Sequence, residues 1–300
     1  MLGGSNRVSL AKIFIEEAKK LKLKCNIFSY DLEKFSPILA VGKIVIGKKW
    51  DDKSILKDIG KVIKKNQIHL VIANTDPSTL ILSKLKKLHP SCCLTSDYKD
   101  NYLCYDKLMI KKFLNNNHIK TTYFAKEFPL IVKKRFGSSS KDMIILKNRK
   151  EYNQFNKTKN RDEYIIEKFL NGKEFSVDSY VSQKGKILGI VIRERIKVLK
   201  GESIFTRIIT DKRLNKLTIK IIKLLKLKGP LNLQFILNKN YYLMEINPRF
   251  PGGAIATIKS GFNIPSMMIR EIKNLKLNKI SKIKKIQMVK YFTEYYENNY

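Results

Sequence analysis

Histidine and cysteine are scarce in this chain of 300 residues, which has three histidines and four cysteines. The cysteines, Cys25, Cys92, Cys93 and Cys104, do not follow the spacing of metal ligands, so we expect reduced, structural thiols. No apolar run approaches the roughly 20 residues that a membrane span needs, and no secretory leader is visible. The sequence therefore predicts a cytoplasmic protein without a membrane partner.

Acidic residues are also few, because 26 Asp and Glu stand against 61 Lys and Arg, for a formal net charge of +35. Such an excess predicts non-specific binding to polyanions at low salt. The basic residues are spread along the whole chain and accompany abundant isoleucine and asparagine, a pattern typical of AT-rich coding. Lysines on helix faces, such as Lys61, Lys64 and Lys65, are expected to be solvated. We therefore expect no specific nucleic-acid partner.

Internal repeats and low-complexity linkers are absent, and 300 residues with 43% hydrophobic content suffice for two or three domains around one cleft. Alternating elements over roughly the first hundred residues predict a small, parallel, doubly wound α/β sheet. The expected helices are 8–23, 55–65 and 78–88, and the expected strands are 24–29, 43–46 and 69–73. Gly3 and Gly4 lack both a preceding strand and the third glycine of a dinucleotide fingerprint. Either this sheet lacks its first strand or the true start lies upstream.

The remainder of the chain predicts an α+β nucleotide-binding module. The expected helices are 106–116 and 214–227, and the expected strands are 129–133, 143–146, 164–170, 174–181 and 186–195. The last two strands predict an antiparallel meander, and a flexible loop is expected at 136–141. Arg193 and Arg207 fit a solvated basic strand as well as a functional role.

Two strands further along carry polar side chains at alternating positions. Asn232 and Gln234 share one face, and Glu245 and Asn247 share one face of the next strand. A two-residue turn at Lys239-Asn240, or a four-residue loop, would pair Gln234 with Glu245 and Asn232 with Asn247. The opposite, apolar faces would then form a packed underside of Leu231, Leu233, Phe235, Tyr242, Met244 and Ile246.

The side chains on this hairpin suit a metal ion and a phosphate. Mg²⁺ takes hard oxygen ligands and uses one or two carboxylates while phosphates and water complete its shell. One Glu, one Gln and two Asn fit that preference. Arg249 follows at the exit of the strand, where its planar fork can grip a phosphate oxygen. The alternative is an ordinary edge hairpin with a polar face.

Two other places carry side chains that suit a nucleotide. Lys133 ends an apolar strand just before the loop 137–140, which is rich in small residues and can close over phosphates, although such loops are also common on surfaces. Glu167 and Glu174 flank Asn171-Gly172, where a tight bend would return both carboxylates to one wall. Taken singly, each of these carboxylates fits a solvated charge.

In their order along the chain, these pieces resemble the ATP-grasp enzymes. The pieces are Asp106-Lys107, 129–133 with its Gly-Ser loop, 167–174, 232–234 and 245–249. The similarity covers nearly the whole chain and is greatest to the carbamoyl-phosphate-synthetase-like branch, which includes biotin carboxylase relatives and amino-acid ligases. It implies an N-terminal Rossmann-like domain over 1–97 and a two-lobe ATP-grasp domain over 98–300. The small lobe would span about 105–165 and the large lobe about 166–300.

The resemblance also implies roles for particular side chains. The nucleotide-binding residues that it implies are Lys107, Lys133, Ser138, Ser139, Ser140, Glu167, Phe169 and Glu174. The implied metal ligands are Gln234, Glu245 and Asn247, which would hold two Mg²⁺ ions, or Mn²⁺ in their place. The implied catalytic residues are Arg249, for the transferring phosphoryl group, and Arg195, near the acceptor carboxylate.

The activity that follows from the resemblance is an ATP-dependent ligation. ATP would phosphorylate a small-molecule carboxylate, and an amine would displace the phosphate. No enzyme nucleophile is needed, because phosphoryl transfer is catalysed mostly by positioning and charge neutralisation. The serine loop would then be a lid that keeps water from an acyl phosphate. Two alternatives are an enzyme that activates bicarbonate or carbamate and a protein that binds nucleotide or nucleic acid without turnover. The sequence is compatible with a homodimer.

Overall fold

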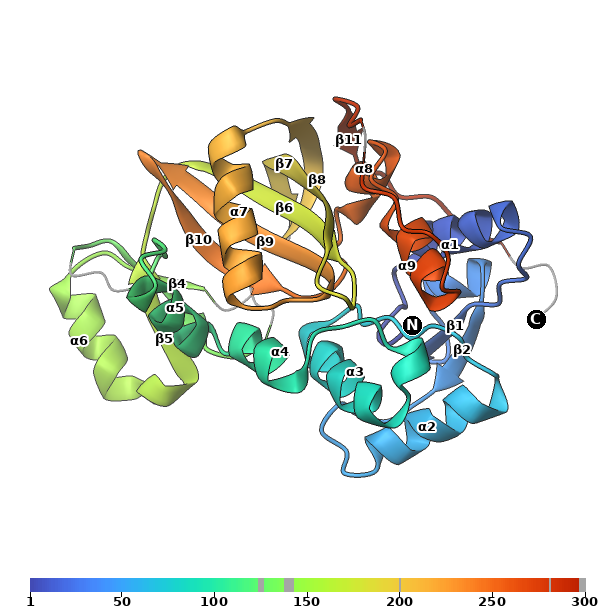
Figure 1. Ribbon diagram of the computed structural model, residues 1–300. Helices are drawn as coiled ribbons and strands as arrows, with labels where there is room; N and C mark the ends of the chain where they lie inside the picture. The colour runs from blue at the N-terminus through green and yellow to red at the C-terminus, as the bar shows by residue number, and fades with distance from the viewer. Residues whose placement is uncertain (124–126, 138–142, 200, 281, 297–300) are drawn as a thin grey trace.

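The computed structural model describes residues 1–123, 127–137, 143–199, 201–280 and 282–296 (Figure 1). Its N-terminal part alternates helices and short strands. These elements are α1 (Val8–Lys20), β1 (Phe28–Asp31), a 3₁₀ turn (Pro37–Ala40), β2 (Lys43–Ile46), α2 (Ile55–Lys65), α3 (Asp76–Leu88) and a second 3₁₀ turn (Pro90–Cys92). β1 and β2 pair in parallel, as the alternation of elements predicts.

Beyond β1 and β2, single residues take the place of strands in this sheet. Leu2 makes parallel bridges to both Tyr30 and Ala73, and Val71 bridges Cys93. The predicted strand 69–73 is therefore wrong as a continuous strand, and the one predicted at 24–29 begins only at Phe28. Leu2 occupies the position of a first strand and is 2% exposed. Burial of this apolar side chain holds the bridges together.

A small antiparallel sheet follows, in the order β4-β3-β5. Its elements and their neighbours are α4 (Tyr98–Tyr105), α5 (Lys107–Asn116), β3 (Leu130–Lys134), β4 (Ile144–Leu146), α6 (Arg149–Thr158), a 3₁₀ turn (Arg161–Glu163) and β5 (Tyr164–Lys168). Phe155 of α6 packs on Leu130, Val132 and Leu146 and buries one face of this sheet. β5 pairs with β3, so it belongs to the small sheet although the predicted lobe boundary falls within it.

The large sheet has the order β10-β9-β6-β7-β8-β11, and every neighbouring pair is antiparallel. Its elements and their neighbours are β6 (Lys173–Val181), β7 (Ile187–Leu199), β8 (Glu202–Ile209), α7 (Lys212–Leu224), β9 (Gly229–Asn238), β10 (Asn240–Asn247), α8 (Ala254–Lys259), α9 (Ile264–Ile272) and β11 (Gln287–Val289). The predicted meander is confirmed as β6 and β7, and β7 continues four residues further than expected.

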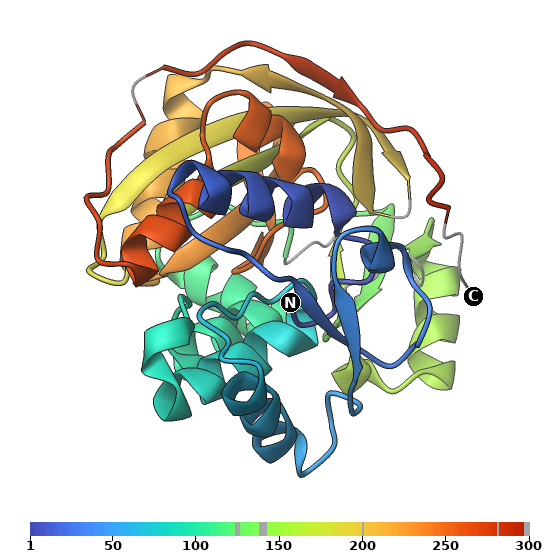
Figure 2. The same cartoon turned by 90° about the vertical axis from the view of Figure 1, so that its right-hand side faces the viewer.

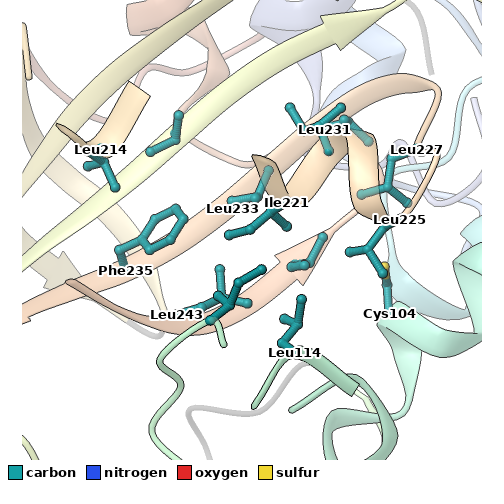
Figure 3. Packing of buried hydrophobic residues seen from close by; sticks show 14 of the residues in the cluster. Cys104, Leu114, Leu214, Ile221, Leu225, Leu227, Leu231, Leu233, Phe235 and Leu243 are labelled. Carbon is teal, nitrogen blue, oxygen red and sulfur yellow. The ribbon is translucent and has the colours of Figure 1, made fainter. Parts of the chain in front are cut away.

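Helices cover the two faces of the large sheet unequally. On one face, Leu231, Leu233 and Phe235 of β9 pack against Leu214 and Ile221 of α7 (Figures 1 and 3). α1, α8 and α9 cover part of the other face, where α1 lies beside α9 (Figure 2). The rest of that second face remains open to a cleft. This arrangement leaves one polar surface of the sheet for a ligand.

The β9–β10 hairpin pairs its polar residues as predicted, but by another route. Glu245 lies opposite Gln234 and Asn247 opposite Asn232. The predicted two-residue turn is wrong, because Asn238 pairs with Asn240 and Lys239 alone forms the tip, with φ of 56°. A β-bulge between Leu243 and Glu245 inserts one residue and restores the expected pairs.

The bulge also changes which side chains face the core. Tyr241 and Leu243 are buried in the core beneath the sheet, as Figure 3 shows for Leu243. The prediction that Tyr242 and Met244 form the packed underside is therefore wrong, and Met244 lines the cleft instead. When a strand contains one extra residue, the side chains that precede this residue point to the opposite face of the sheet from the one expected without it.

In the described part of the chain no helix combines the length and the apolar character needed to cross a membrane. The cytoplasmic location stays a prediction. All four cysteines are free thiols, and Cys92, Cys93 and Cys104 are buried, as expected of structural residues.

Candidate active site

A cleft of about 510 Å³ lies between the large sheet, the small sheet and the N-terminal part. The predicted site residues that line it are Lys107, Lys133, Glu167, Phe169, Glu174, Arg195, Gln234, Glu245, Asn247 and Arg249. Ser138, Ser139 and Ser140 fall outside the described residues. The structure thus gathers around one cavity every predicted site residue that it describes, while the role of each stays a prediction.

The register of the large sheet explains how residues distant in sequence meet on the cleft floor. Gln234 of β9 lies beside Ser176 of β6, which in turn lies beside Arg193 of β7. One row further along, Glu174 lies beside Arg195. Side chains of directly paired residues point to the same face of an antiparallel sheet. The floor is therefore a grid of polar side chains carried by rigid strands.

The hairpin residues form a donor set made of one carboxylate and amide oxygens. Gln234 Nε2 donates a hydrogen bond to Asn232 Oδ1 (3.4 Å), which leaves the Gln234 carbonyl oxygen available on the cleft side. Arg249 Nη2 donates to Asn247 Oδ1 (3.4 Å). Within the described segments, no group of three or more His, Cys, Asp or Glu side chains could hold a metal ion. A donor set with a single carboxylate and amide oxygens suits Mg²⁺, whose coordination shell phosphate oxygens can complete. It does not suit zinc, which prefers thiolate and imidazole ligands.

Glu167 is the centre of a buried ionic cluster. Its carboxylate is fully buried and accepts hydrogen bonds from Lys111 Nζ, from Lys133 Nζ (3.1 Å) and from Thr122 Oγ1 (2.7 Å). Lys111 also donates to Thr122 Oγ1 (2.7 Å) and is itself buried. The prediction that Glu167 fits a solvated charge when taken singly is wrong, because two lysines on neighbouring elements reach it.

Two cations on one carboxylate shift the pKa values of the cluster. Burial alone would raise the pKa of Glu167, but Lys111 and Lys133 outweigh it and lower that pKa to about 2. Burial lowers the pKa of Lys111 to about 8, with Lys133 acting in the same direction. The attraction of Glu167 outweighs burial at Lys133 and raises its pKa. Lys133 therefore stays charged at the cleft wall, where its side chain is 14% exposed.

Lys107 is fixed at the first turn of α5. Asp106 caps this helix, because its Oδ1 accepts from the backbone N–H groups of Leu108 (3.0 Å) and Met109 (3.1 Å). Arg135 holds the same carboxylate through Nε (2.9 Å) and Nη2 (2.6 Å). Lys107 Nζ donates to the carbonyl oxygen of Gly137, at the edge of the predicted serine loop. Asp106 is buried and is held both by the helix N-terminus and by Arg135. It therefore fixes the start of α5, from which the side chain of Lys107 extends.

The arginines of the meander behave differently from one another. Arg195 Nε donates to Glu174 Oε2 (3.0 Å), and both residues line the cleft. Arg193 is 1% exposed and donates from Nε to Asp178 Oδ2 (2.8 Å), so the solvated alternative is wrong for it. The side chain of Arg207 is 44% exposed and pairs with Glu194, as a solvated basic strand predicts. Period-two alternation already places Arg193 and Arg195 on one face.

Arg249 reaches from the end of β10 to the N-terminal part. Its Nε donates to Asp76 Oδ1 (2.5 Å), and Asp76 is the first residue of α3. Thr75 caps this helix through a capping box with Ser78. No local motif marks Asp76, Lys111 or Thr122 as part of the site, because their partners lie far away in the sequence.

Apolar side chains complete one wall of the cleft. The residues are Ile131, Met143, Leu170, Ile236 and Met244, beside Phe169, which is 39% exposed. They come from β3, the residue before β4, the β5–β6 turn and the hairpin. A flat aromatic ligand fits between such a wall and the polar floor.

The fold defined by these sheets and this cleft is that of ATP-grasp proteins. It matches N5-carboxyaminoimidazole synthetase from Staphylococcus aureus, complexed with ADP, with a TM-score of 0.74 at 22% identity, covering 95% of this chain and 80% of the other. It also matches L-amino acid ligase from Bacillus licheniformis, with a TM-score of 0.68 at 18% identity, covering 87% and 71%.

Sequence comparison agrees with the fold. Residues 160–295 match a family described as ATP-grasp in the biosynthetic pathway with Ter operon. A segment of 135 residues is 31% identical to the carbamoyl phosphate synthase large chain of Pyrococcus furiosus; this match covers 41% of the chain and 13% of that protein's length. Sequence and fold are therefore both similar to those of ATP-grasp proteins, which confirms the resemblance read from the motifs of this chain.

Proposed function

We propose that this protein is an ATP-dependent ligase that activates a carboxylate as an acyl phosphate and transfers the acyl group to an amine. The observation that carries the proposal is the position of Lys133 and Glu245 on the same cleft. A charged lysine can neutralise the phosphates of ATP, and oxygen donors can bind the Mg²⁺ that accompanies them. The apolar wall can pack against the adenine base. The ADP complex of the Staphylococcus aureus relative supports the same ligand here.

The nucleotide would lie along the small sheet. Its base would pack on the apolar wall and contact the backbone of Glu167 to Phe169, because the Glu167 side chain points inward to Lys111. Glu174 would accept hydrogen bonds from the ribose hydroxyls. Lys107 and Lys133 would hold the phosphates, and the serine loop would cover them. In this assignment Lys133 and Glu167 come from the small sheet and Glu174 from the floor of the cleft.

Gln234, Glu245 and Asn247 would hold Mg²⁺, as two ions, with Mn²⁺ able to replace it. The bound metal would neutralise phosphate charge during the transfer. Asn232 does not need to be a ligand, because its Nδ2 donates to Asp178 Oδ1 (2.7 Å) and its Oδ1 accepts from Gln234. It positions Gln234 instead.

The chemistry proceeds in two displacements. A carboxylate oxygen of the substrate attacks the γ-phosphorus of ATP, and the bond to the β-γ bridging oxygen breaks to release ADP. The amine then attacks the acyl carbon, the bond from carbon to the phosphate oxygen breaks, and the nitrogen loses a proton. Arg249 and Lys133 would hold the transferring phosphoryl group, and Arg195 would lie near the acceptor carboxylate. Catalysis rests on positioning and charge, which the buried ion pairs provide.

The organisation of the whole protein is part of the proposal. An N-terminal domain over 1–97 and an ATP-grasp domain over 98–300 would enclose the cleft from opposite sides, with carboxylate and amine as small-molecule partners. Arg249 paired with Asp76 supports a shared site at their junction. A homodimer is compatible with this organisation.

Glu245→Ala tests the proposal directly. We expect Mg²⁺-dependent ADP release, stimulated by a pool of amino and hydroxy acids, to fall by about 10²–10³-fold, as for other key electrostatic groups. The readout is ADP formed in a coupled assay. Glu16→Ala, an exposed carboxylate on α1, is the matched control and should keep full activity. Full activity of Glu245→Ala would rule out the metal assignment.

A second candidate is activation of bicarbonate, which the similarity to a carbamoyl phosphate synthase large chain favours. Bicarbonate would then stimulate ADP release without any organic acid. MgATP binding without stimulated release under any of these conditions would indicate a nucleotide-binding protein that lacks turnover.

A further inference from the structure

One end of the cleft contains buried polar atoms without partners. Asn74, Arg193 and Ser203 are 2%, 1% and 3% exposed, and all three line the cleft. Within the described part of the chain, Asn74 Oδ1, Arg193 Nη1 and Ser203 Oγ have no hydrogen-bond partner. Buried polar groups almost always have one, since leaving a group unpaired costs free energy. Three such atoms around one cavity indicate the place of a ligand.

These residues belong to one continuous wall. A Cβ added at Gly253 would lie 2.4 Å from Arg193 Nη1, and one added at Gly252 would lie 2.2 Å from Glu202 Oε1. Arg193 and Glu202 therefore touch neighbouring glycines, and Ser203 follows Glu202 directly. Arg7 Nη1 lies 3.3 Å from Glu202 Oε1 and links this wall to the N-terminal part.

Asn74 reaches the same end of the cleft from the other side. It precedes Thr75 and Asp76, and Asp76 binds Arg249. The Nδ2 of Asn74 donates to the carbonyl oxygen of Leu2 (3.3 Å), so this nitrogen is already used within the N-terminal part. The Oδ1 of Asn74 remains available as an acceptor. The two walls thus offer a donor from Arg193, an acceptor from Asn74 and a hydroxyl from Ser203.

Each of the cations at this end already contacts a carboxylate. Arg7 pairs with Glu202 (3.3 Å), Arg193 with Asp178 (2.8 Å) and Arg249 with Asp76 (2.5 Å). Lys290 also contacts Glu202 (2.7 Å). A doubly charged phosphate ester would need uncompensated cations, because transfer of an unpaired charge from water is unfavourable. A ligand with one positive and one negative group matches the wall better.

We propose that this end of the cleft binds a free α-amino acid as the carboxylate substrate. The inference rests on the proposed function and names its substrate class. The carboxylate of the ligand accepts from Arg193 Nη1 and Ser203 Oγ, and its ammonium donates to Asn74 Oδ1 and the Glu202 carboxylate. Arg193 shares a row of the sheet with Gln234, through Ser176, so the carboxylate lies next to the proposed phosphate site.

The test combines two variants with two readouts. Equilibrium dialysis with labelled common L-amino acids and a non-hydrolysable ATP analogue measures binding without turnover. ADP release measures the KM for the acid and for ATP separately. Ser203→Ala should raise the KM for the amino acid about tenfold and leave that for ATP unchanged. Ser179→Ala, another buried hydroxyl on the large sheet outside the cleft, should change neither.

A second position separates loss of a contact from loss of the fold. Asn74→Ala should weaken amino-acid binding about tenfold, while Asn74→Asp loses the hydrogen bond to Leu2 but keeps the acceptor oxygen, so it should bind more tightly than Asn74→Ala. Asn74→Asp must therefore not behave like Asn74→Ala. Thermal unfolding of both variants shows whether each remains folded.

The substrate class is tested by comparing how strongly different acids stimulate ADP release. We expect the amino-acid pool to stimulate ADP release and the same acids without an amino group to do so at least tenfold less. Equal stimulation by the deaminated acids, or stimulation by phosphorylated sugar amines alone, would overturn the inference while leaving a ligase. Binding of an amino acid that depends on Ser203, without any ADP release, would instead uphold the inference and contradict the proposed reaction.

Discussion

At the residue scale, the carboxylate of Glu167 is buried between two lysines at the wall of the cleft. Lys111 and Thr122 hold the Glu167 side chain from the interior, and Lys133 approaches it from the cleft. If Lys133 binds phosphate as proposed, a side chain already fixed in this way would need less reorganisation on binding. The cluster carries a net positive charge when all three groups are ionised, which favours an anionic ligand beside Lys133.

Removing the Glu167 charge should destabilise the protein in a pH-dependent manner. Glu167→Gln leaves two buried lysines unpaired, so we expect a loss of about 3 kcal/mol in the free energy of unfolding at pH 7. The folded-state pKa of about 2 lies below the ordinary value of 4.5, so this stabilisation is complete above pH 4.5 and disappears as the pH falls towards 2.

Urea unfolding of Glu167→Gln and its parent at pH 7 and pH 3 measures this difference. It should be smaller at pH 3 than at pH 7. Glu16→Gln, on the exposed face of α1, should unfold like the parent at both values. A Glu167→Gln loss that is equal at both pH values would contradict an ionised carboxylate in the cluster.

At the scale of elements, the β9–β10 hairpin places the predicted metal ligands, and its bulge corrects for a tight turn. Met244 and Glu245 together oppose Gln234, so both face the cleft. Leu243 before the bulge and Ile246 after it face the core. The extra residue therefore keeps Glu245 opposite Gln234 despite the tight tip, and it also adds an apolar side chain to the cleft wall.

Deletion of Met244 should therefore preserve the ligand pairs. We expect a folded protein whose circular dichroism resembles the parent's and whose ADP release survives, with a weaker KM for ATP because part of the apolar wall is gone. Insertion of an alanine after Ile246 should instead turn Asn247 towards the core and abolish ADP release. Equal loss of activity in both variants would contradict this account of the bulge.

The sequence predicts these elements well where periodicity is strong. Helix α2 and strand β2 match the predicted ranges, and the pairs of Glu245 with Gln234 and Asn247 with Asn232 are confirmed. Periodicity could not reveal the bulge, because either register of the hairpin buries an apolar face.

Long-range contacts were harder to predict from the sequence. Lys111, Thr122 and Asp76 carry no local signal, since each acquires its role from a partner on another element. The burial of Arg193 likewise depends on Asp178 in a neighbouring strand. The order of the motifs was enough to indicate the resemblance to ATP-grasp proteins, whereas only the fold revealed these supporting residues.

At the scale of the whole molecule, the cleft and the surface have different electrostatics. The formal net charge is +35, yet the arginines at the junction of the N-terminal part and the large sheet are paired with carboxylates. Net charge governs non-specific association, whereas paired charges govern a specific site. The two should therefore respond differently to salt.

We expect the protein to bind DNA of any sequence at about 50 mM salt and to lose most of that binding at about 200 mM salt. Fluorescence anisotropy with two unrelated duplexes measures it. ATP-dependent turnover should change far less over the same range, because buried charges are screened weakly. A strong preference for one duplex, retained at high salt, would indicate a specific nucleic-acid function.

The bulge at Met244 also has a consequence for how this chain is compared with its relatives. A bulge absorbs a change of one residue in chain length without moving the strand that follows. Related proteins whose hairpin has the same one-residue tip but no bulge should therefore show a one-residue gap within residues 239–244, just before the Glu-x-Asn-x-Arg stretch, whereas those with a two-residue turn need no gap. For a relative of the first kind, an alignment that forbids this gap would slide that stretch by one position and assign the proposed metal ligands to the buried face.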